Sequence, residues 1–204
     1  MGCVFCDRQK NDIERTIYEN DLFYIMPTLG QIPKNGGHIL IIPKGHVDCI
    51  ANLHDTKAGP ILVFIELTRE VMKKEYGQEI AMFEHGIVGQ TVKHAHLHLF
   101  PGKDSDKMTE RVRKDFPLAE IDVLRHHDDL FDSYEATAEP YLFWQGEDGI
   151  PRVCWNPPAP PQYFRTVLAE LLGYPERANW RTMDPELDKK LIAETITRLK
   201  PHLA

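Results

Sequence analysis

The sequence has no long hydrophobic run. Its longest uninterrupted apolar stretch, Ile61 to Ile65, is far shorter than the roughly 20 apolar residues that a membrane-spanning helix needs. The N-terminal stretch MGCVFCDRQKNDIERT also lacks the apolar segment of a secretory signal peptide. These absences predict a protein with no membrane partner and a cytoplasmic location.

An excess of positive charge is missing as well. Lysine and arginine together number 24, against 31 aspartate and glutamate residues, which gives a net charge of −7. Such a balance creates no general attraction to nucleic acid or to anionic membranes. The composition therefore predicts no nucleic-acid partner, and any site for a polyanion has to be local.

Cysteine is scarce, with four residues in a chain of 204, so the sequence does not predict a disulfide-stabilised scaffold. Cys3 and Cys6 form a C-x-x-C pair. Such a pair can place two thiolates on one metal ion, and the alternative is a chance pair of reduced thiols near a chain end. Cys49 and Cys154 are expected to be ordinary core or surface residues.

Short apolar runs, separated by Gly, Pro and Asn-Asp, predict strands in the first half of the chain. We expect a hairpin over residues 15–26, strands over 38–43, 79–86 and 93–100, and a helix over 59–76. This order predicts an α+β fold, in which an antiparallel meander has one helix packed across it.

The second half of the chain is first highly charged and then rich in aromatic residues. It predicts a hairpin about Gly146 to Gly149 and helices near residues 163–172 and 185–199. We therefore expect three parts. They are a first domain over residues 1–102, a charged connector of loop and helix over 103–140, and a mixed α/β C-terminal extension over 141–204 that packs on the first domain.

The stretch QTVKHAHLHLF carries three histidines at alternating positions, His94, His96 and His98. In a strand these imidazoles share one face, and the apolar residues between them share the other. The row could be a polar strand face with no function, three ligands of a catalytic zinc, or a nucleophile with supporting imidazoles. Same-face neighbours lie about 6.6 Å apart, which makes it difficult for all three to reach one ion.

GQTVKHAHLHLFPG resembles the signature of the histidine-triad (HIT) superfamily, and its GQTVKH resembles the diadenosine-polyphosphate hydrolase-like branch. GGHILIIPKGH, from Gly36 to His46, is similar to the upstream strand of that family. The resemblance covers roughly residues 3–102 and implies that residues 1–102 form a HIT-like catalytic domain.

The resemblance implies a covalent mechanism for a nucleotide hydrolase or nucleotidyl transferase. His96 would attack the α-phosphorus of a dinucleoside polyphosphate or related phosphoester or phosphoramidate, giving a nucleotidyl-histidine. His98 would contact the phosphoryl oxygens or the leaving group. The other residues implied at the nucleotide and phosphate site are His38, Gly89, Gln90 and Thr91. Pro27 stands where the family usually has Asp or Asn for the ribose, so ribose recognition is expected to differ.

Two alternatives to this mechanism stay open. The three histidines could be the ligands of a zinc-dependent hydrolase, or the chain could be a nucleotide-binding or interaction module without turnover. Hydrolase, phosphorylase and transferase activities all fit the same covalent intermediate.

Cys3, Cys6, His46 and His94 make a plausible set of four zinc ligands. The set resembles an arrangement in some HIT relatives and in galactose-1-phosphate uridylyltransferases, where the first histidine of the triad binds metal and the next is the nucleophile. We expect a structural zinc and no organic cofactor.

The resemblance also implies a homodimer. The C-terminal extension is rich in aromatic residues suited to such an interface or to stacking on a nucleobase: Trp144, Trp155, Tyr163, Phe164 and Trp180. For Trp144 and Trp155 the alternative is that both are buried in the hairpin.

Overall fold

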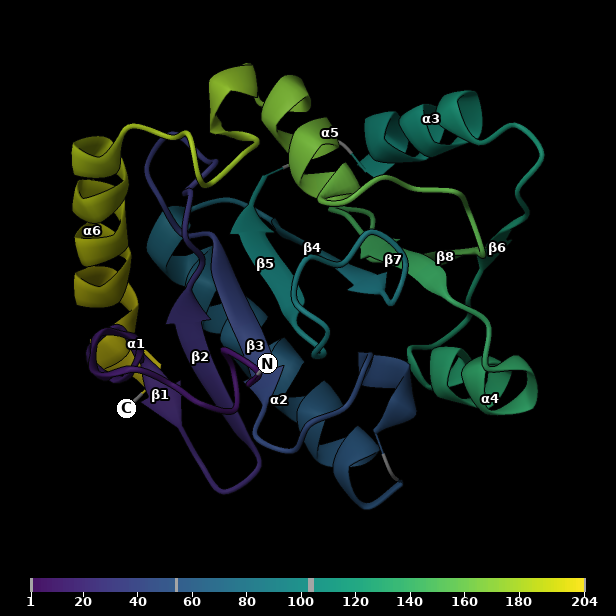
Figure 1. Ribbon diagram of the computed structural model, residues 1–204, viewed down its shortest axis with the longest axis horizontal. Coiled ribbons are helices and arrows are strands. Elements are labelled where there is room, and N and C mark those ends of the chain that lie inside the picture. Colours follow the sequence, from purple (N-terminus) through teal and green to yellow (C-terminus); the bar gives the residue numbers. More distant parts are fainter. Residues whose placement is uncertain (1, 54, 103–104, 204) are drawn as a thin grey trace.

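The computed structural model describes residues 2–53, 55–102 and 105–203, and its centre is one antiparallel sheet of eight strands (Figure 1). The strands are β1 (Tyr18–Glu19), β2 (Phe23–Pro27), β3 (Ile39–Pro43), β4 (Ile80–Gly86), β5 (Leu97–Pro101), β6 (Ile121–Val123), β7 (Tyr141–Gln145) and β8 (Pro151–Trp155). The helices are α1 (Lys10–Glu14), α2 (Asp55–Tyr76), α3 (Ser105–Asp115), α4 (Asp128–Thr137), α5 (Tyr163–Leu171) and α6 (Pro185–Leu203). Two short 3-10 helices, η1 (Ile50–Asn52) and η2 (Pro175–Arg177), complete the described elements. The predicted α+β class is confirmed.

The strands follow the order β1-β2-β3-β5-β4-β7-β8-β6. The predicted antiparallel pairing and helix are confirmed, but the predicted meander is wrong, because β5 lies between β3 and β4. After β3 the chain crosses one face of the sheet as α2 and re-enters the sheet as β4, two strand positions away from β3. β5 then occupies the position between them. Consequently His98 in β5 lies opposite Leu40 of β3 and Phe83 of β4, in the interior of the sheet.

Apolar clusters lie on both faces of the sheet, and the two largest are on opposite faces. On one face α2 buries Ile61, Ile65 and Met72, which recur at helical spacing, in a cluster that includes Leu97 and Leu99. On the other face α3 and α5 cover the second half of the sheet with a cluster of mainly aromatic and aliphatic side chains. Full burial of one such side chain stabilises the fold by about 1.5–3 kcal/mol, so both cores hold the helices against the sheet.

The second half of the chain continues the same sheet. β7 pairs with β4 along its whole length, from Met82 opposite Gln145 to Gly86 opposite Tyr141. Gly86 is required here because a Cβ atom would lie 2.3 Å from the Tyr141 ring. The predicted hairpin about residues 146–149 is confirmed as β7 and β8, and the predicted C-terminal helices are confirmed as α5 and α6.

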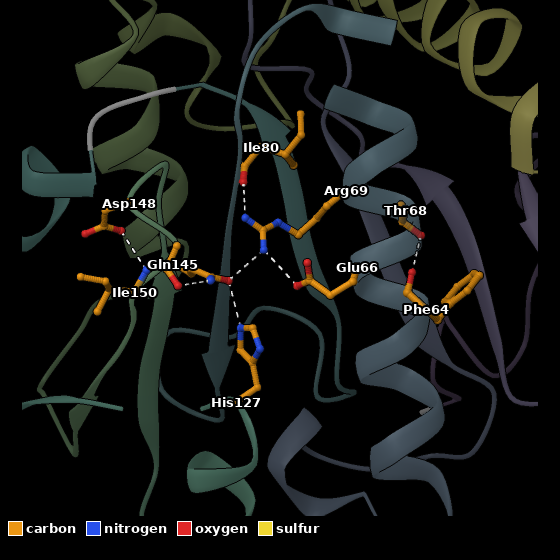
Figure 2. A network of polar contacts seen from close by, with 10 residues as sticks. Phe64, Glu66, Thr68, Arg69, Ile80, His127, Gln145, Asp148 and Ile150 are labelled. Atoms are coloured by element: carbon orange, nitrogen blue, oxygen red, sulfur yellow. Dashed lines mark hydrogen bonds and ion pairs between the residues drawn. The ribbon is translucent and has the colours of Figure 1, made fainter. Parts of the chain in front are cut away.

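Polar contacts also connect α2 to the strands of the second half (Figure 2). The Arg69 guanidinium donates hydrogen bonds to Glu66, to Gln145 Oε1 at 3.4 Å and to the Ile80 carbonyl at 3.3 Å. Gln145 Oε1 also accepts a hydrogen bond from His127 at 2.9 Å. Arg69 thereby joins a helix of the first half to β4 and β7.

Helix α6 returns to the first half of the chain and packs against α2 and β2. The Asp188 carboxylate accepts the backbone N–H groups of Gly30 and Gln31, each at 2.9 Å. The Thr195 hydroxyl accepts the N–H of Gly37 at 2.8 Å. These bonds hold the loop between β2 and β3, which forms one wall of the cavity described below. Within the part of the chain described, no helix combines the length and apolar character needed to span a bilayer.

Candidate active site

A cavity of about 280 Å³ lies where the N-terminal segment, the loop after β2 and the start of α5 meet the sheet. Most of its lining is apolar, and its charged and polar groups come from segments far apart in the sequence. The lining includes Phe5, Arg8, Arg15, Tyr24, Thr28, His85, Gly89, Thr91, His96, His98, Arg165 and Trp180. An apolar cavity with a few convergent polar groups is the form that small-molecule sites usually take.

Of the three alternating histidines, only His98 lies within β5, and His94 and His96 precede the strand. The predicted alternation of faces is nevertheless confirmed. Ala95 and Leu97 are buried in the core on the α2 side, whereas His96 and His98 line the cavity. On this shared face the ring centroids of His96 and His98 lie 5.1 Å apart.

A backbone carbonyl determines the tautomer of His96. Its Nδ1 lies 2.6 Å from the carbonyl oxygen of His94, and because a carbonyl can only accept, Nδ1 carries the proton. Neutral His96 therefore has its lone pair on Nε2. Burial lowers the pKa of His96 to about 4, so the imidazole is neutral near pH 7. A neutral imidazole with an unprotonated Nε2 at a cavity can act as a nucleophile.

His98 and His38 form a buried pair, with His38 Nε2 2.9 Å from His98 Nδ1. Burial lowers the pKa of both well below the usual value, so both are neutral. His38 Nδ1 has no partner among the described residues. A buried lone pair is easier to leave unpaired than a buried N–H, which favours His38 Nε2–H as the donor. His98 then carries its proton on Nε2 and can donate it in a hydrogen bond to an anion.

The structure brings most of the predicted phosphate-site residues to the cavity. Gly89 and Thr91 line it together with His98. His38 lies behind His98 and supports it rather than lining the cavity. The Gln90 side chain is a correction to the prediction, because its amide donates to the Asp48 carbonyl at 2.6 Å instead of lining the cavity.

Several lining residues lie outside the predicted phosphate and catalytic site, among them His85, Arg165 and Trp180. Of these, Trp180 was expected only as one of the aromatic residues of the C-terminal extension. His85 belongs to β4, where its Nε2 accepts the N–H of Phe164 at 3.1 Å. Arg165 comes from α5, and Trp180 follows η2. None of the three lies in a recognisable motif, and only the fold brings their segments to the triad.

A second cluster lies at the N-terminus, where one ligand atom from each of Cys3, Cys6, His46 and His94 falls within 4.8 Å of the others. His94 Nδ1 is 3.3 Å from Cys3 Sγ and 3.5 Å from Cys6 Sγ, and His46 Nδ1 is 3.4 Å from Cys6 Sγ. Tetrahedral zinc with Zn–N and Zn–S bonds of about 2.0–2.3 Å requires ligand separations of roughly 3.3–3.8 Å. The three separations given above fall within this range.

The tautomer of His94 suits the same role. Its Nε2 lies 2.8 Å from the Pro43 carbonyl oxygen, so Nε2 carries the proton and Nδ1 is left to bind a metal. Within the described ranges, this is the one converging group of potential metal ligands, and it contains neither His96 nor His98. The arrangement gives no support to a catalytic zinc held by all three histidines.

The predicted stacking role of two tryptophans is not supported. Trp144 is completely buried in the core that α5 covers, and its Nε1 donates to Thr109 at 3.1 Å. Trp155 packs against Tyr141 and donates to Asp122 at 2.8 Å. The alternative of burial in the hairpin holds for Trp144, whereas Trp155 is only partly buried. The tryptophan at the cavity is Trp180.

Comparison with known proteins gives the family of the first half. A family model described as the HIT domain matches residues 9–105. Residues 9–105 are a HIT domain. This part of the chain contains His38, the loop with Gly89 and Thr91, and the three histidines of the triad.

Curated relatives match the HIT half of the chain. An uncharacterized HIT-like protein of Methanocaldococcus jannaschii is 29% identical over 107 residues, which are 51% of this chain and 81% of that protein. The adenosine 5′-monophosphoramidase of Schizosaccharomyces pombe is 28% identical over 102 residues, 50% of this chain and 74% of that protein. The match to the HIT domain model and the similarity to a relative named as a monophosphoramidase together support HIT-type enzymatic activity for this chain.

Among solved structures, a hypothetical histidine triad nucleotide-binding protein from Sulfolobus tokodaii is 20% identical, with a TM-score of 0.43. The match covers 48% of this chain and 68% of that one. Both kinds of comparison thus cover about half of the chain.

Proposed function

We propose that this HIT protein cleaves nucleotides at the α-phosphate through a covalent nucleotidyl-His96 intermediate, as a hydrolase or a nucleotidyl transferase. The observation that carries the proposal is the neutral imidazole of His96 at the cavity, with its Nδ1–H donated to the His94 carbonyl and its Nε2 unprotonated. The substrate class is that of dinucleoside polyphosphates and nucleoside phosphoramidates. The relatives named as monophosphoramidases support phosphoramidates in particular.

Each step conserves atoms and charge. His96 Nε2 forms a bond to the α-phosphorus while the bond from phosphorus to the leaving group breaks. The leaving group keeps the electron pair of that bond and takes up a proton from water. The positive charge that develops on the ring is stabilised by the His94 carbonyl at Nδ1. His98 Nε2–H, together with Gly89 and Thr91, donates to phosphoryl oxygens. Water or the hydroxyl of another acceptor then attacks phosphorus and releases its proton to solvent. The bond from phosphorus to His96 breaks with its electron pair on Nε2, which restores the neutral imidazole.

The zinc site is a further part of the proposal. Cys3, Cys6, His46 and His94 would hold one zinc ion that ties the N-terminal segment to the catalytic strand. Phe5, between the two cysteines, lies against the ring of His96 with 5.3 Å between centroids. A structural ion here would therefore also position one wall of the cavity. Reduced thiolate ligands are consistent with a cytoplasmic location.

A homodimer also belongs to the proposal, on the strength of the family resemblance. Trp144 gives this part no support, because it lies in the core of its own chain. Sedimentation velocity over a range of protein concentrations measures the oligomeric state directly. A single monomeric species at micromolar concentration would refute the dimer and leave the chemistry unaffected.

Mass spectrometry of the intact protein tests the intermediate. Wild-type protein is mixed with a panel of dinucleoside polyphosphates and nucleoside phosphoramidates and quenched without acid. We expect an added mass of one nucleoside monophosphate, which is absent from His96→Ala. Turnover without such an adduct, combined with turnover by His96→Ala, would refute the mechanism. Tight binding of the panel without any turnover would favour the binding module instead.

A further inference from the structure

Arg165 on α5 is a buried cation with no acidic partner. Only 4% of the residue is exposed, and none of the ion pairs found among the described residues involves it. The charge of Asp188 acts on it without an ion pair, and the two oxygens of that carboxylate already accept the N–H groups of Gly30 and Gln31. Burying an unpaired charge is costly, so such a group at a cavity is a candidate for a functional role.

The hydrogen bonds of Arg165 leave part of its guanidinium unused. Nε donates to the Ala178 carbonyl at 3.3 Å, Nη1 to the Thr28 hydroxyl at 3.3 Å and Nη2 to the Gly30 carbonyl at 2.8 Å. A guanidinium has five N–H groups, so about two remain. Its three bonds hold the guanidinium in a fixed orientation.

The same guanidinium lines the cavity that holds the triad. Arg165 shares this lining with His96, His98, Gly89 and Thr91. Burial is the main cause of the low pKa of His96, and the charge of Arg165 contributes to it, as expected for groups close together. A fixed cation beside a neutral nucleophile and N–H donors matches the charge of a phosphate group.

We propose that Arg165 binds a non-bridging oxygen of the phosphate that His96 attacks, so that the C-terminal half of the chain completes the anion site of the HIT domain. The proposal rests on the proposed function for the identity of this phosphate. It assigns a substrate-binding role to α5, which lies outside residues 9–105.

Arg177 provides a matched comparison within the same region. It is also buried, with 8% exposed, and its Nη1 donates to the carbonyls of Ile32 and Pro33 at 3.1 and 3.2 Å. Its guanidinium lies over the Tyr174 ring at 4.2 Å and does not line the cavity. Both arginines hold the loop after β2, and only Arg165 also faces the triad.

Calorimetric titration with inorganic phosphate, AMP and adenosine separates these two roles. We expect Arg165→Met to weaken phosphate and AMP binding about 10- to 100-fold, the usual effect of losing a hydrogen bond to a charged group. Adenosine affinity is expected to stay within twofold of wild type, because adenosine has no phosphate. Arg177→Met is expected to lower the melting temperature and to leave phosphate affinity unchanged.

Arg165→Lys keeps the charge and serves if Arg165→Met does not fold. We expect it to fold and to bind phosphate more weakly than wild type and more tightly than the methionine variant. Wild-type phosphate and AMP affinities in folded Arg165→Met, or in Arg165→Lys if only that variant folds, would overturn the proposal. An equal loss of phosphate affinity in Arg177→Met would overturn it as well.

Failure of the proposed function gives a different result. A wild-type protein that turns over no nucleotide, yet binds phosphate through Arg165, would refute the enzyme and keep the anion site. Conversely, full turnover with unchanged KM in Arg165→Met would refute the anion site and keep the enzyme.

Discussion

Two backbone carbonyls assign different chemistry to neighbouring histidines. The Pro43 carbonyl holds the proton of His94 on Nε2, and the His94 carbonyl holds the proton of His96 on Nδ1. His94 is thereby left with a free Nδ1 toward the cysteines, and His96 with a free Nε2. Identical side chains two positions apart can therefore bind a metal and attack phosphorus, because each tautomer leaves a different nitrogen unprotonated.

Replacing the nucleophile should abolish turnover and spare binding. For His96→Ala we expect kcat with a nucleoside phosphoramidate to fall on the order of 10⁴-fold, because no other group supplies the attacking nitrogen. AMP affinity measured by calorimetry should change by only a few-fold. His127→Ala is the control, since His127 contacts Gln145 away from the cavity. Near wild-type kcat in His96→Ala would exclude this residue as the nucleophile.

Glu84 is a buried carboxyl group outside the cavity. It accepts the Tyr141 hydroxyl at 2.6 Å and the Ile50 N–H at 2.7 Å. Burial raises its pKa from 4.5 to about 7, against the opposing effect of these hydrogen bonds. In this range the folded protein holds a proton that the unfolded chain has released. The free energy of unfolding should therefore fall as pH rises from about 4.5 to 7.

Glu84→Gln should remove this part of the pH dependence. Since one pKa unit corresponds to about 1.4 kcal/mol, the difference in unfolding free energy between variant and wild type should move in favour of the variant by about 3 kcal/mol from pH 4.5 to 7. Urea denaturation at several pH values measures this difference, and contributions shared by both proteins cancel. A difference that does not vary with pH would show that Glu84 has an ordinary pKa.

At the scale of elements, the N-terminal segment has few contacts of its own to fix its position, and a metal bound to Cys3 and Cys6 would add to them. Residues 2–9 form no regular helix or strand, yet Phe5 packs on the rings of His94 and His96. The Tyr24 hydroxyl also donates to the Phe5 carbonyl at 3.0 Å. A metal at the cysteines would convert this exposed segment into a stable wall of the cavity, since metal binding contributes to folding free energy.

Cys3→Ser combined with Cys6→Ser should therefore release about one equivalent of zinc and lower the melting temperature. We expect KM for the nucleotide to rise more than kcat falls, because a wall of the cavity is loosened while His96 remains. Elemental analysis, thermal denaturation and steady-state kinetics measure the three effects. Cys154→Ala is the control, because Cys154 is buried far along the sequence in β8. Wild-type protein purified without chelators and free of metal would contradict the site.

At the scale of the whole molecule, one sheet runs through both halves of the chain. β4 pairs with β7 as fully as with β5, so the HIT domain has no free sheet edge on that side. Helices α5 and α6 then return to the loop after β2 through Arg165 and Asp188. The second half is thus attached to the first at the sheet, at α2 and at the cavity wall.

A chain that ends after Pro140 should aggregate. It loses β7, β8, α5 and α6, and the backbone of β4 becomes an unpaired edge beside uncovered apolar side chains. Soluble yield and size-exclusion chromatography measure the outcome. Coexpression of residues 141–204 as a separate chain is expected to restore part of the soluble protein. A soluble, monomeric chain of residues 1–140 would show that the first part folds without the second.

Local patterns in the sequence were sufficient for the strands other than β6, for most of the helices and for the two motif-bearing segments. Apolar runs such as residues 39–42 and the alternation around His96 depend on neighbours along the chain, so they predict burial and face correctly. The spacing of Cys3 and Cys6 likewise predicted that the two thiols lie close enough to share one metal ion. Each of these features depends only on residues close together in the sequence.

Only the tertiary structure decided the position of β5, the burial of Trp144 and the arrival of Arg165, His85 and Trp180 at the cavity. An arginine on an amphipathic helix has the same local pattern whether it meets solvent or a phosphate site. The difference lies in contacts between residues more than a hundred positions apart, such as the bond from Arg165 to Gly30. Such contacts form because the whole sheet buries its two faces at once, and no local window of sequence contains that constraint.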